Sequence, residues 1–332
     1  MCLIPFTSRL AAAVQGRRPK VRIPLFPKAL KPYYLARDKQ NCRTPAAPPT
    51  RPRRRATRRK EDALAFLKLT LVTFGLLYAV ALSGMYVFQR DLQYFPTRRA
   101  PAPAALGLTG VQTVALPTPD GETLVLWFSP PEAGRPVILF LHGNAGEIAD
   151  RADRFAFYQS RGYGVAFLSW RGYGGSTGSP SETGLLADAK AAYDHLRQQG
   201  ISADRIVLVG ESLGTGPAVI TAAANPVAAV ILEAPYSAAV DIARRAYPWL
   251  PVGLLMKDQY RSRDHIAAIH APLLILHGGK DRVIPQGFGQ RLYDLAQEPK
   301  TFLSLGPVGH EALFSPATWE KEAAFIDRTV GP

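Results

Sequence analysis

The chain has 332 residues and a mass of 36.1 kDa, a length that allows one large domain or two of ordinary size. The net charge of +14 at first fits a nucleic-acid-binding protein, but residues 1–60 hold 17 basic residues and one acid. Residues 61–332 are close to neutral, with 23 basic and 25 acidic residues, which argues against a nucleic-acid-binding domain there. Both cysteines, Cys2 and Cys42, lie in the basic segment, so a disulfide or a cysteine-ligated metal site is excluded from the remainder.

Residues 1–62 are rich in arginine and proline and include the run Arg51–Lys60. A segment of this composition buries too little apolar surface to offset its ordering entropy, so we expect a disordered tail. Three interpretations of the tail remain open: a solvated extension, an over-extended gene start, or a tether for anionic lipid headgroups. We favour the solvated extension or the over-extended start, because no aromatic stacking pattern accompanies the arginines. Nucleic-acid binding through the tail is a further alternative, but no nucleic-acid partner is expected.

Residues 63–88 predict a membrane anchor. The twenty residues Leu69–Phe88 carry no charge, and at 1.5 Å per residue they cover about 30 Å, the thickness of a hydrocarbon core. A buried core helix would show a polar stripe, which this segment lacks. Ala79–Ala81 resembles a signal-peptidase cleavage site, but a cleaved signal peptide does not begin with a sixty-residue leader. The positive charge before the helix predicts a cytoplasmic N-terminus and a C-terminal domain on the opposite side.

Residues 89–110 are interpreted as a juxtamembrane linker, and residues 111–332 as one α/β domain. Short β-branched or bulky runs predict eight strands, at 111–116, 123–128, 137–141, 164–169, 205–209, 228–232, 272–276 and 301–305. Helical patterns alternate with the later runs, at 148–160, 182–199, 213–224, 286–296 and 317–328. This alternation predicts a mostly parallel eight-stranded sheet with helices on both faces.

Ser212 is the predicted nucleophile. It lies in Gly210–Gly214, a G-x-S-x-G pattern that follows an apolar strand and opens a helix. Glycines two residues to either side permit the tight turn that exposes the serine, and the helix N-terminus favours negative charge on a reacting oxygen.

A nucleophilic serine needs a base, and the base needs an orienting acid. His310 is the predicted base because it lies in a loop directly after the last strand. His277 is better explained as a buried, backbone-bonded histidine, and His265 and His270 as surface residues of a polar helix. Asp281 is the predicted acid because of its place after a strand and the chain order Ser, Asp, His, and its rival is Glu233.

The backbone N–H groups of Asn144 and Leu213 are the predicted oxyanion donors. Asn144 belongs to the glycine-containing loop His142–Gly146 at the end of a strand, and His142 itself is expected to bond the loop rather than react. The glycine-rich loop Arg171–Glu182 lacks the spacing of a nucleotide-binding motif, so we interpret it as a structural element at the rim of the site.

Residues 236–268 predict a small cap. Its apolar stretch Tyr247–Met256 fits a helical connection packed on the core and an acyl pocket near a bilayer equally well.

Together Ser212, Asp281, His310 and the oxyanion loop resemble the α/β-hydrolase superfamily. Six motifs resemble its single-pass, bud-emergence-type members and the serine aminopeptidase-like branch; they are Leu92–Pro96, His142–Gly146, Arg171–Glu182, Gly210–Gly216, Glu233–Ser237 and His277–Pro285. The resemblance covers about residues 85–330 and implies an α/β-hydrolase fold and a membrane-anchored serine hydrolase acting on an acyl ester, thioester or lipid ester. A peptidase with the same triad, or a catalytically silent scaffold, remains an alternative. No cofactor or metal is expected. The composition and charge bias predict the bacterial inner membrane, with the hydrolase domain in the periplasm.

Overall fold

The structure, a computed structural model, describes residues 54–331. The first described element is the long helix α1, Arg54–Gln93. Most of the expected tail lies outside the described residues, but residues 54–62 are helical, which differs from the expected disorder. Arginine, lysine, glutamate and alanine are favourable helix formers, and here they extend a helix that the following apolar residues already favour.

Helix α1 is also long and apolar enough to cross a membrane. The candidate span, Thr57–Gln93, contains an 18-residue window with a mean hydropathy of 2.0, and none of that window is buried. A soluble core helix would bury such a window.

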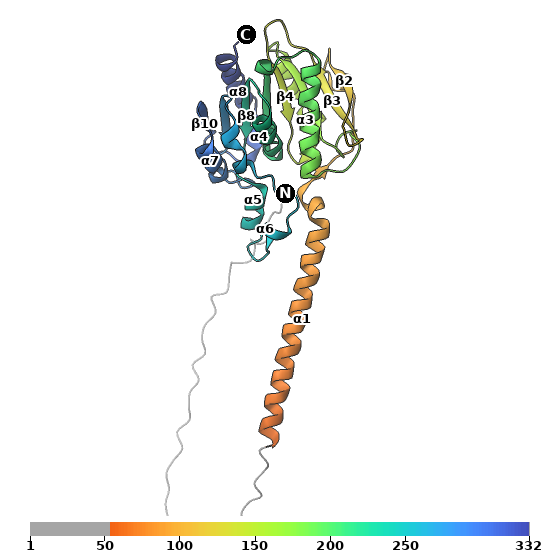
Figure 1. Cartoon of the computed structure of the whole chain (residues 1–332), viewed down its shortest axis with the longest axis vertical. Helices are drawn as coiled ribbons and strands as arrows, with labels where there is room; N and C mark the ends of the chain where they lie inside the picture. Colours follow the sequence, from red (N-terminus) through yellow and green to blue (C-terminus); the bar gives the residue numbers. More distant parts are fainter. Residues whose placement is uncertain (1–53, 332) are drawn as a thin grey trace, which may run out of the picture. The chain divides into compact units, whose positions relative to one another are not determined.

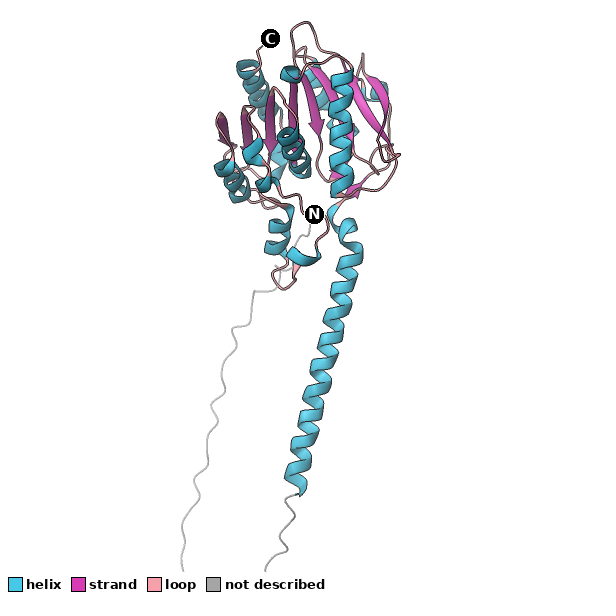
Figure 2. Ribbon diagram, in the orientation of Figure 1, coloured by secondary structure: helices cyan, strands magenta, loops and turns pink. Residues whose placement is uncertain are grey.

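An eight-stranded sheet forms the centre of the C-terminal domain (Figure 2). Its spatial order is β10-β9-β8-β7-β4-β6-β3-β2. Only the β2–β3 and β3–β6 pairs are antiparallel, and the other five pairs are parallel, so the predicted, mostly parallel sheet is confirmed. The strands are β2 (Gln112–Pro117), β3 (Thr123–Ser129), β4 (Val137–Leu141), β6 (Gly164–Ser169), β7 (Ile206–Glu211), β8 (Ala229–Glu233), β9 (Leu273–His277) and β10 (Lys300–Ser304).

Helices cover both faces of this sheet (Figure 1). Helices α3 (Glu182–Gln198), α4 (Thr215–Ala224) and α7 (Gln286–Leu295) contribute to one hydrophobic core, and α2 (Ala152–Gln159) and α8 (Pro316–Thr329) contribute to the other. Strands β4, β6, β7, β8 and β9 are buried along their whole length. A strand that is buried on both faces has a continuous run of apolar residues, and such runs predicted these strands from the sequence.

The segment after α1 is more ordered than the expected linker over residues 89–110. Helix α1 continues to Gln93, β1 (Phe95–Pro96) pairs in parallel with β5 (Ala145–Gly146), and a 3-10 turn follows at Pro103–Leu106. Tyr94 is buried, and its hydroxyl lies 2.8 Å from that of Tyr260. Residues 93–96 therefore pack as part of the C-terminal domain.

The connection from β8 to β9 contains two helices, α5 (Ala239–Ala246) and α6 (Val252–Leu255), followed by two 3-10 turns at Ser262–Asp264 and Ile266–Ala268. It begins at the carboxyl end of β8 (Figure 1). This is the region interpreted as a small cap.

Candidate active site

Ser212 follows β7 directly and has a backbone φ of 52°, in the left-handed region that non-glycine residues rarely adopt. Close packing explains the neighbouring glycine: a Cβ at Gly214 would lie 2.0 Å from the carbonyl oxygen of Leu141. The turn after β7 therefore packs directly on the end of β4, and α4 begins at Thr215 just beyond it. A strained serine between a strand and a helix is the geometry of a nucleophile elbow.

His310 and Asp281 complete a hydrogen-bonded chain with this serine. The Nε2 atom of His310 lies 3.1 Å from the Oγ atom of Ser212, and its Nδ1 atom lies 2.6 Å from Oδ2 of Asp281. These residues follow β7, β9 and β10, whose carboxyl ends meet at the same edge of the sheet. The structure thus brings together the three residues that the sequence analysis selected.

Two backbone N–H groups hold Asp281 in place. Those of Val283 and Ile284 donate to its Oδ1 atom at 2.8 and 2.9 Å, which leaves Oδ2 for His310. Burial alone would raise the pKa of Asp281, but the hydrogen bond to His310 and these backbone donors outweigh it and lower the pKa. The carboxylate is therefore charged at neutral pH and can accept the Nδ1–H of His310.

The loop that contains Asn144 lies beside the nucleophile turn. Strands β4 and β7 are neighbours, with Leu141 opposite Gly210, so the chain leaves both strands at the same place. A Cβ at Gly143 would lie 3.4 Å from the Cβ of Ser212. The Asn144 and Leu213 backbone groups therefore belong to adjoining turns next to Ser212, an arrangement in which two N–H groups can face one oxyanion.

The segment after α1 supports this loop. The N–H of Phe95 donates to the carbonyl oxygen of Asn144 at 2.8 Å, and the Asn144 amide side chain donates to the Gln93 carbonyl at 3.1 Å. The hydroxyl of Tyr173, from the loop 171–182, donates to the same Asn144 carbonyl at 2.9 Å. The contribution of residues 93–96 was not predicted from the sequence, because a parallel two-residue pairing leaves no hydrophobic periodicity.

Glu211 is a second residue that the sequence analysis missed. Its side chain is buried, accepts the Gly143 N–H at 3.1 Å and pairs with Arg151 at 2.6 Å. Burial alone would raise the pKa of Glu211, but the charges of Arg151 and Arg154 and the hydrogen bond to Arg151 outweigh it and lower the pKa to about 2. The sequence does contain one indication of this role, because Glu211 is a charged residue directly after the apolar run Ile206–Val209.

The alternatives considered for the triad have other partners. Glu233 is buried and pairs with Arg154 at 2.6 Å, and Arg154 also binds Glu322 on α8. The Nε2 atom of His277 contacts the Ile284 carbonyl at 2.7 Å, and the Nδ1 atom of His142 contacts the Gly143 carbonyl at 2.8 Å. Burial lowers the pKa values of both histidines, so both are neutral at pH 7.

His265 and His270 are exposed as expected. They do not lie on a polar helix, however, because residues 262–268 form two short 3-10 turns. Arg171, at the start of the glycine-rich loop, is buried and binds Asp188 and Asp120 through its guanidinium, which supports a structural role for that loop. Among residues 54–331 no group of three or more His, Cys, Asp or Glu side chains is arranged to hold a metal ion.

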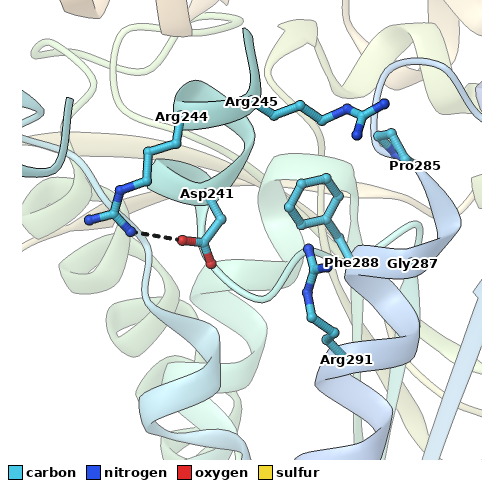
Figure 3. Close-up of a pocket in the computed structure, with 7 residues that line it drawn as sticks. All are labelled: Asp241, Arg244, Arg245, Pro285, Gly287, Phe288 and Arg291. Carbon is cyan, nitrogen blue, oxygen red and sulfur yellow. Dashed lines mark hydrogen bonds and ion pairs between the residues drawn. The ribbon is translucent and has the colours of Figure 1, made fainter. Parts of the chain in front are cut away.

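A cavity of about 290 Å³ opens between α5 and α7, the helices that follow β8 and β9 (Figure 3). Asp241 in its wall is paired with Arg244, while Arg245 and Arg291 extend on either side of Phe288. The cavity is therefore lined mainly by basic side chains around the Phe288 ring. The lining residues are Asp241, Arg244, Arg245, Pro285, Gly287, Phe288 and Arg291.

The fold and the site together define an α/β hydrolase, and comparisons with known proteins agree. A family model described as "alpha/beta hydrolase fold" matches residues 136–255. The uncharacterized protein Rv2307c of Mycobacterium tuberculosis is 39% identical over 240 residues, which cover 70% of this chain and 85% of the relative. The protein bem46 of Schizosaccharomyces pombe is 32% identical over 243 residues, covering 68% and 78%. The chain belongs to the α/β-hydrolase superfamily and is a homologue of its bem46-like members, which confirms the resemblance carried by the motifs.

Solved structures show the same fold. The Pyrococcus furiosus esterase Pf2001 superposes with a TM-score of 0.58 at 18% identity, covering 72% of this chain and 98% of the esterase. A Mycobacterium tuberculosis puromycin-hydrolyzing peptidase superposes with a TM-score of 0.55 at 21% identity, covering 67% of this chain and 39% of the peptidase. At such identities these likenesses establish the fold, whose known members here include an esterase and a peptidase.

Proposed function

We propose that this chain is a membrane-anchored serine hydrolase that cleaves an acyl ester, thioester or lipid ester. The observation that carries the proposal is the hydrogen-bonded chain from Ser212 through His310 to Asp281, beside a turn with the left-handed φ of a nucleophile elbow. Apolar helix α1 supports the anchor. The charge distribution supports an N-terminus in the cytoplasm and a hydrolase domain in the periplasm of a bacterium.

In the proposed reaction the Oγ atom of Ser212 attacks the acyl carbonyl carbon, and its proton passes to Nε2 of His310. Asp281 holds the imidazole ring and stabilises the positive charge it gains. The N–H groups of Asn144 and Leu213 bind the oxygen that becomes negative in the tetrahedral intermediate. When the intermediate collapses, the leaving alcohol or thiol takes the proton from His310, and the acyl group stays on Ser212.

Water completes the cycle. His310 accepts a proton from a water molecule, whose oxygen attacks the acyl-enzyme carbonyl, and the second tetrahedral intermediate releases the carboxylic acid. The proton on His310 then returns to the Oγ atom of Ser212. The proton transfers in both steps therefore pass through His310, and Ser212 regains its proton at the end of the cycle.

Labelling with a fluorophosphonate tests the activated serine. Native chain and Ser212→Ala in isolated membranes are treated with the probe, and hydrolysis of a matched ester, thioester and amide is measured. We expect labelling of the native chain only and a loss of at least about 10³-fold in ester hydrolysis for Ser212→Ala. Ser237→Ala is the matched control, because Ser237 is also buried and follows a strand of the same sheet but hydrogen-bonds Asp241.

Each outcome bears on the proposal. Labelling or ester turnover that survives in Ser212→Ala contradicts it. A correctly folded native chain that neither labels nor hydrolyses any of the three substrates supports the silent-scaffold alternative, and turnover of the amide alone supports a peptidase.

A further inference from the structure

The cap carries an apolar tip that the hydrolase core does not cover. We define the cap tip as residues 247–256, which contain α6 and the turns on either side of it. Trp249 is 55% exposed and Leu254 is 87% exposed, whereas the other three tryptophans of the chain are at most 7% exposed. Exposure of a tryptophan and a leucine on one short segment is typical of a surface that meets an apolar partner.

The tip lies against α1. The hydroxyl of Tyr78 donates to the Trp249 carbonyl at 2.9 Å, and the two rings are 6.4 Å apart. Farther along the same helix, the Gln89 amide donates to the Leu255 carbonyl at 3.3 Å, and Lys257 lies 4.3 Å from the centre of the Tyr86 ring.

An ion pair joins the end of this contact to the body of the domain. Arg90 binds the buried carboxylate of Asp258 at 2.8 Å, and the Gln93 amide donates to the Asp258 carbonyl. The cap tip therefore follows α1 from Tyr78 to Gln93 through several independent contacts.

The depth of the contact along α1 identifies the partner. Tyr78 precedes Phe88, the last residue of the charge-free run, by ten residues, or about 15 Å of helix. This is about half the thickness of a hydrocarbon core. A bilayer that surrounds the charge-free run of α1 consequently extends past the level of Trp249, so the exposed Trp249 side chain is expected to meet acyl chains rather than water.

Basic side chains flank the tip. Arg244, Arg245 and Lys257 are exposed beside it. The nearby carboxylates of Asp241 and Asp258 are already paired with arginines. An apolar tip with basic flanks is the pattern of a segment that lies in a membrane interface.

We propose that the cap tip docks into the lipid bilayer beside α1, with Trp249 and Leu254 among the acyl chains and the flanking arginines among the headgroups. The proposal rests on the membrane anchor of the proposed function. Docking gives the domain a second attachment to the membrane and orients the carboxyl edge of the sheet, from which the cap emerges, relative to the bilayer.

Tryptophan fluorescence measures this docking directly, because Trp249 is the sole largely exposed tryptophan. The full chain is reconstituted into vesicles of phosphatidylcholine and phosphatidylglycerol, with and without bromine on the acyl chains. We expect brominated lipid to quench part of the emission of the native chain and to leave Trp249→Phe unquenched. Equal quenching of the native chain and Trp249→Phe, or no quenching of either, overturns the proposal.

A matched pair of charge substitutions adds a second readout. Leu254→Asp places a carboxylate in the tip and is expected to lower the quenching of Trp249, because a charge opposes insertion. Leu295→Asp is the control: Leu295 is 49% exposed at the end of α7, beside the start of β10 and thus at the opposite edge of the sheet. Near-ultraviolet circular dichroism confirms that each variant is folded. Equal effects of the two substitutions contradict docking by the tip.

Carbonate extraction of the same vesicles separates this proposal from the anchor on which it rests. A native chain that is extracted refutes the anchor, and with it the docking of the tip. A native chain that resists extraction while Trp249 stays unquenched refutes the docking alone.

Discussion

Replacing Glu211 by glutamine tests the buried ion pair under the nucleophile turn. The side chains of Glu211 and Arg151 are 2% and 5% exposed, and Arg154 lies 3.9 Å from the second carboxylate oxygen. Glutamine keeps an acceptor for the Gly143 N–H but removes the negative charge. The variant therefore leaves two buried guanidinium groups with less compensating charge, which is the costly way to break a buried pair.

The magnitude follows from the pKa of Glu211. Its value falls from 4.5 to about 2 on folding, and at about 1.4 kcal/mol per pH unit this is worth about 3 kcal/mol at neutral pH. Because the folded-state pKa is lowered, this contribution is fully present above pH 4.5 and is lost as the pH falls toward about 2. A domain of this size is stable by about 5–15 kcal/mol, so Glu211→Gln is expected to remain folded.

The assay is urea unfolding of the full chain in detergent, followed by near-ultraviolet circular dichroism at several pH values. Glu211→Gln is expected to lose about 3 kcal/mol at neutral pH, and the difference from the native chain is expected to shrink below pH 4.5. Glu320→Gln is the control, since it removes the same charge from an ion pair with Arg161 that is half exposed, and it should cost less than about 1 kcal/mol. A difference that stays constant as the pH falls, or that equals that of the control, refutes the reasoning.

Two further predictions concern the proposed catalytic groups. Asp281→Asn retains an oxygen that accepts the N–H groups of Val283 and Ile284 but presents an amide to Nδ1 of His310. Ester hydrolysis should therefore fall by about 10⁴-fold without loss of the fold. A fall of less than about tenfold in steady-state assays would argue against Asp281 as the orienting acid. A chain shortened to begin at residue 111 should hydrolyse ester more slowly than one that begins at residue 89, because it lacks the Gln93 and Phe95 groups that bond Asn144. Equal rates for the two shortened chains, both checked by circular dichroism, would contradict that support.

Local sequence determined the elements of the sheet and the identity of the candidate triad. The five buried central strands appear as continuous apolar runs because both of their faces are covered. The strained serine turn needs glycine on both sides, and this leaves the Gly210–Gly214 pattern in the sequence. The chain order of a serine, an acid and a histidine, each after a strand, then favoured Asp281 over its rival Glu233, and His310 over the other histidines.

Tertiary structure alone decided what those elements contact. Glu211 differs from its apolar neighbours because Arg151, sixty residues earlier, lies beneath it. Strand β1, directly after α1, supports the Asn144 loop through a two-residue parallel pairing, too short to produce a periodic pattern. The apolar stretch 247–256 fitted a core helix and a membrane-facing cap equally well by composition. The exposure of Trp249 and Leu254 argues against a core helix and supports the proposed docking at the membrane, and only the structure could supply it, because burial depends on residues that are distant in the chain.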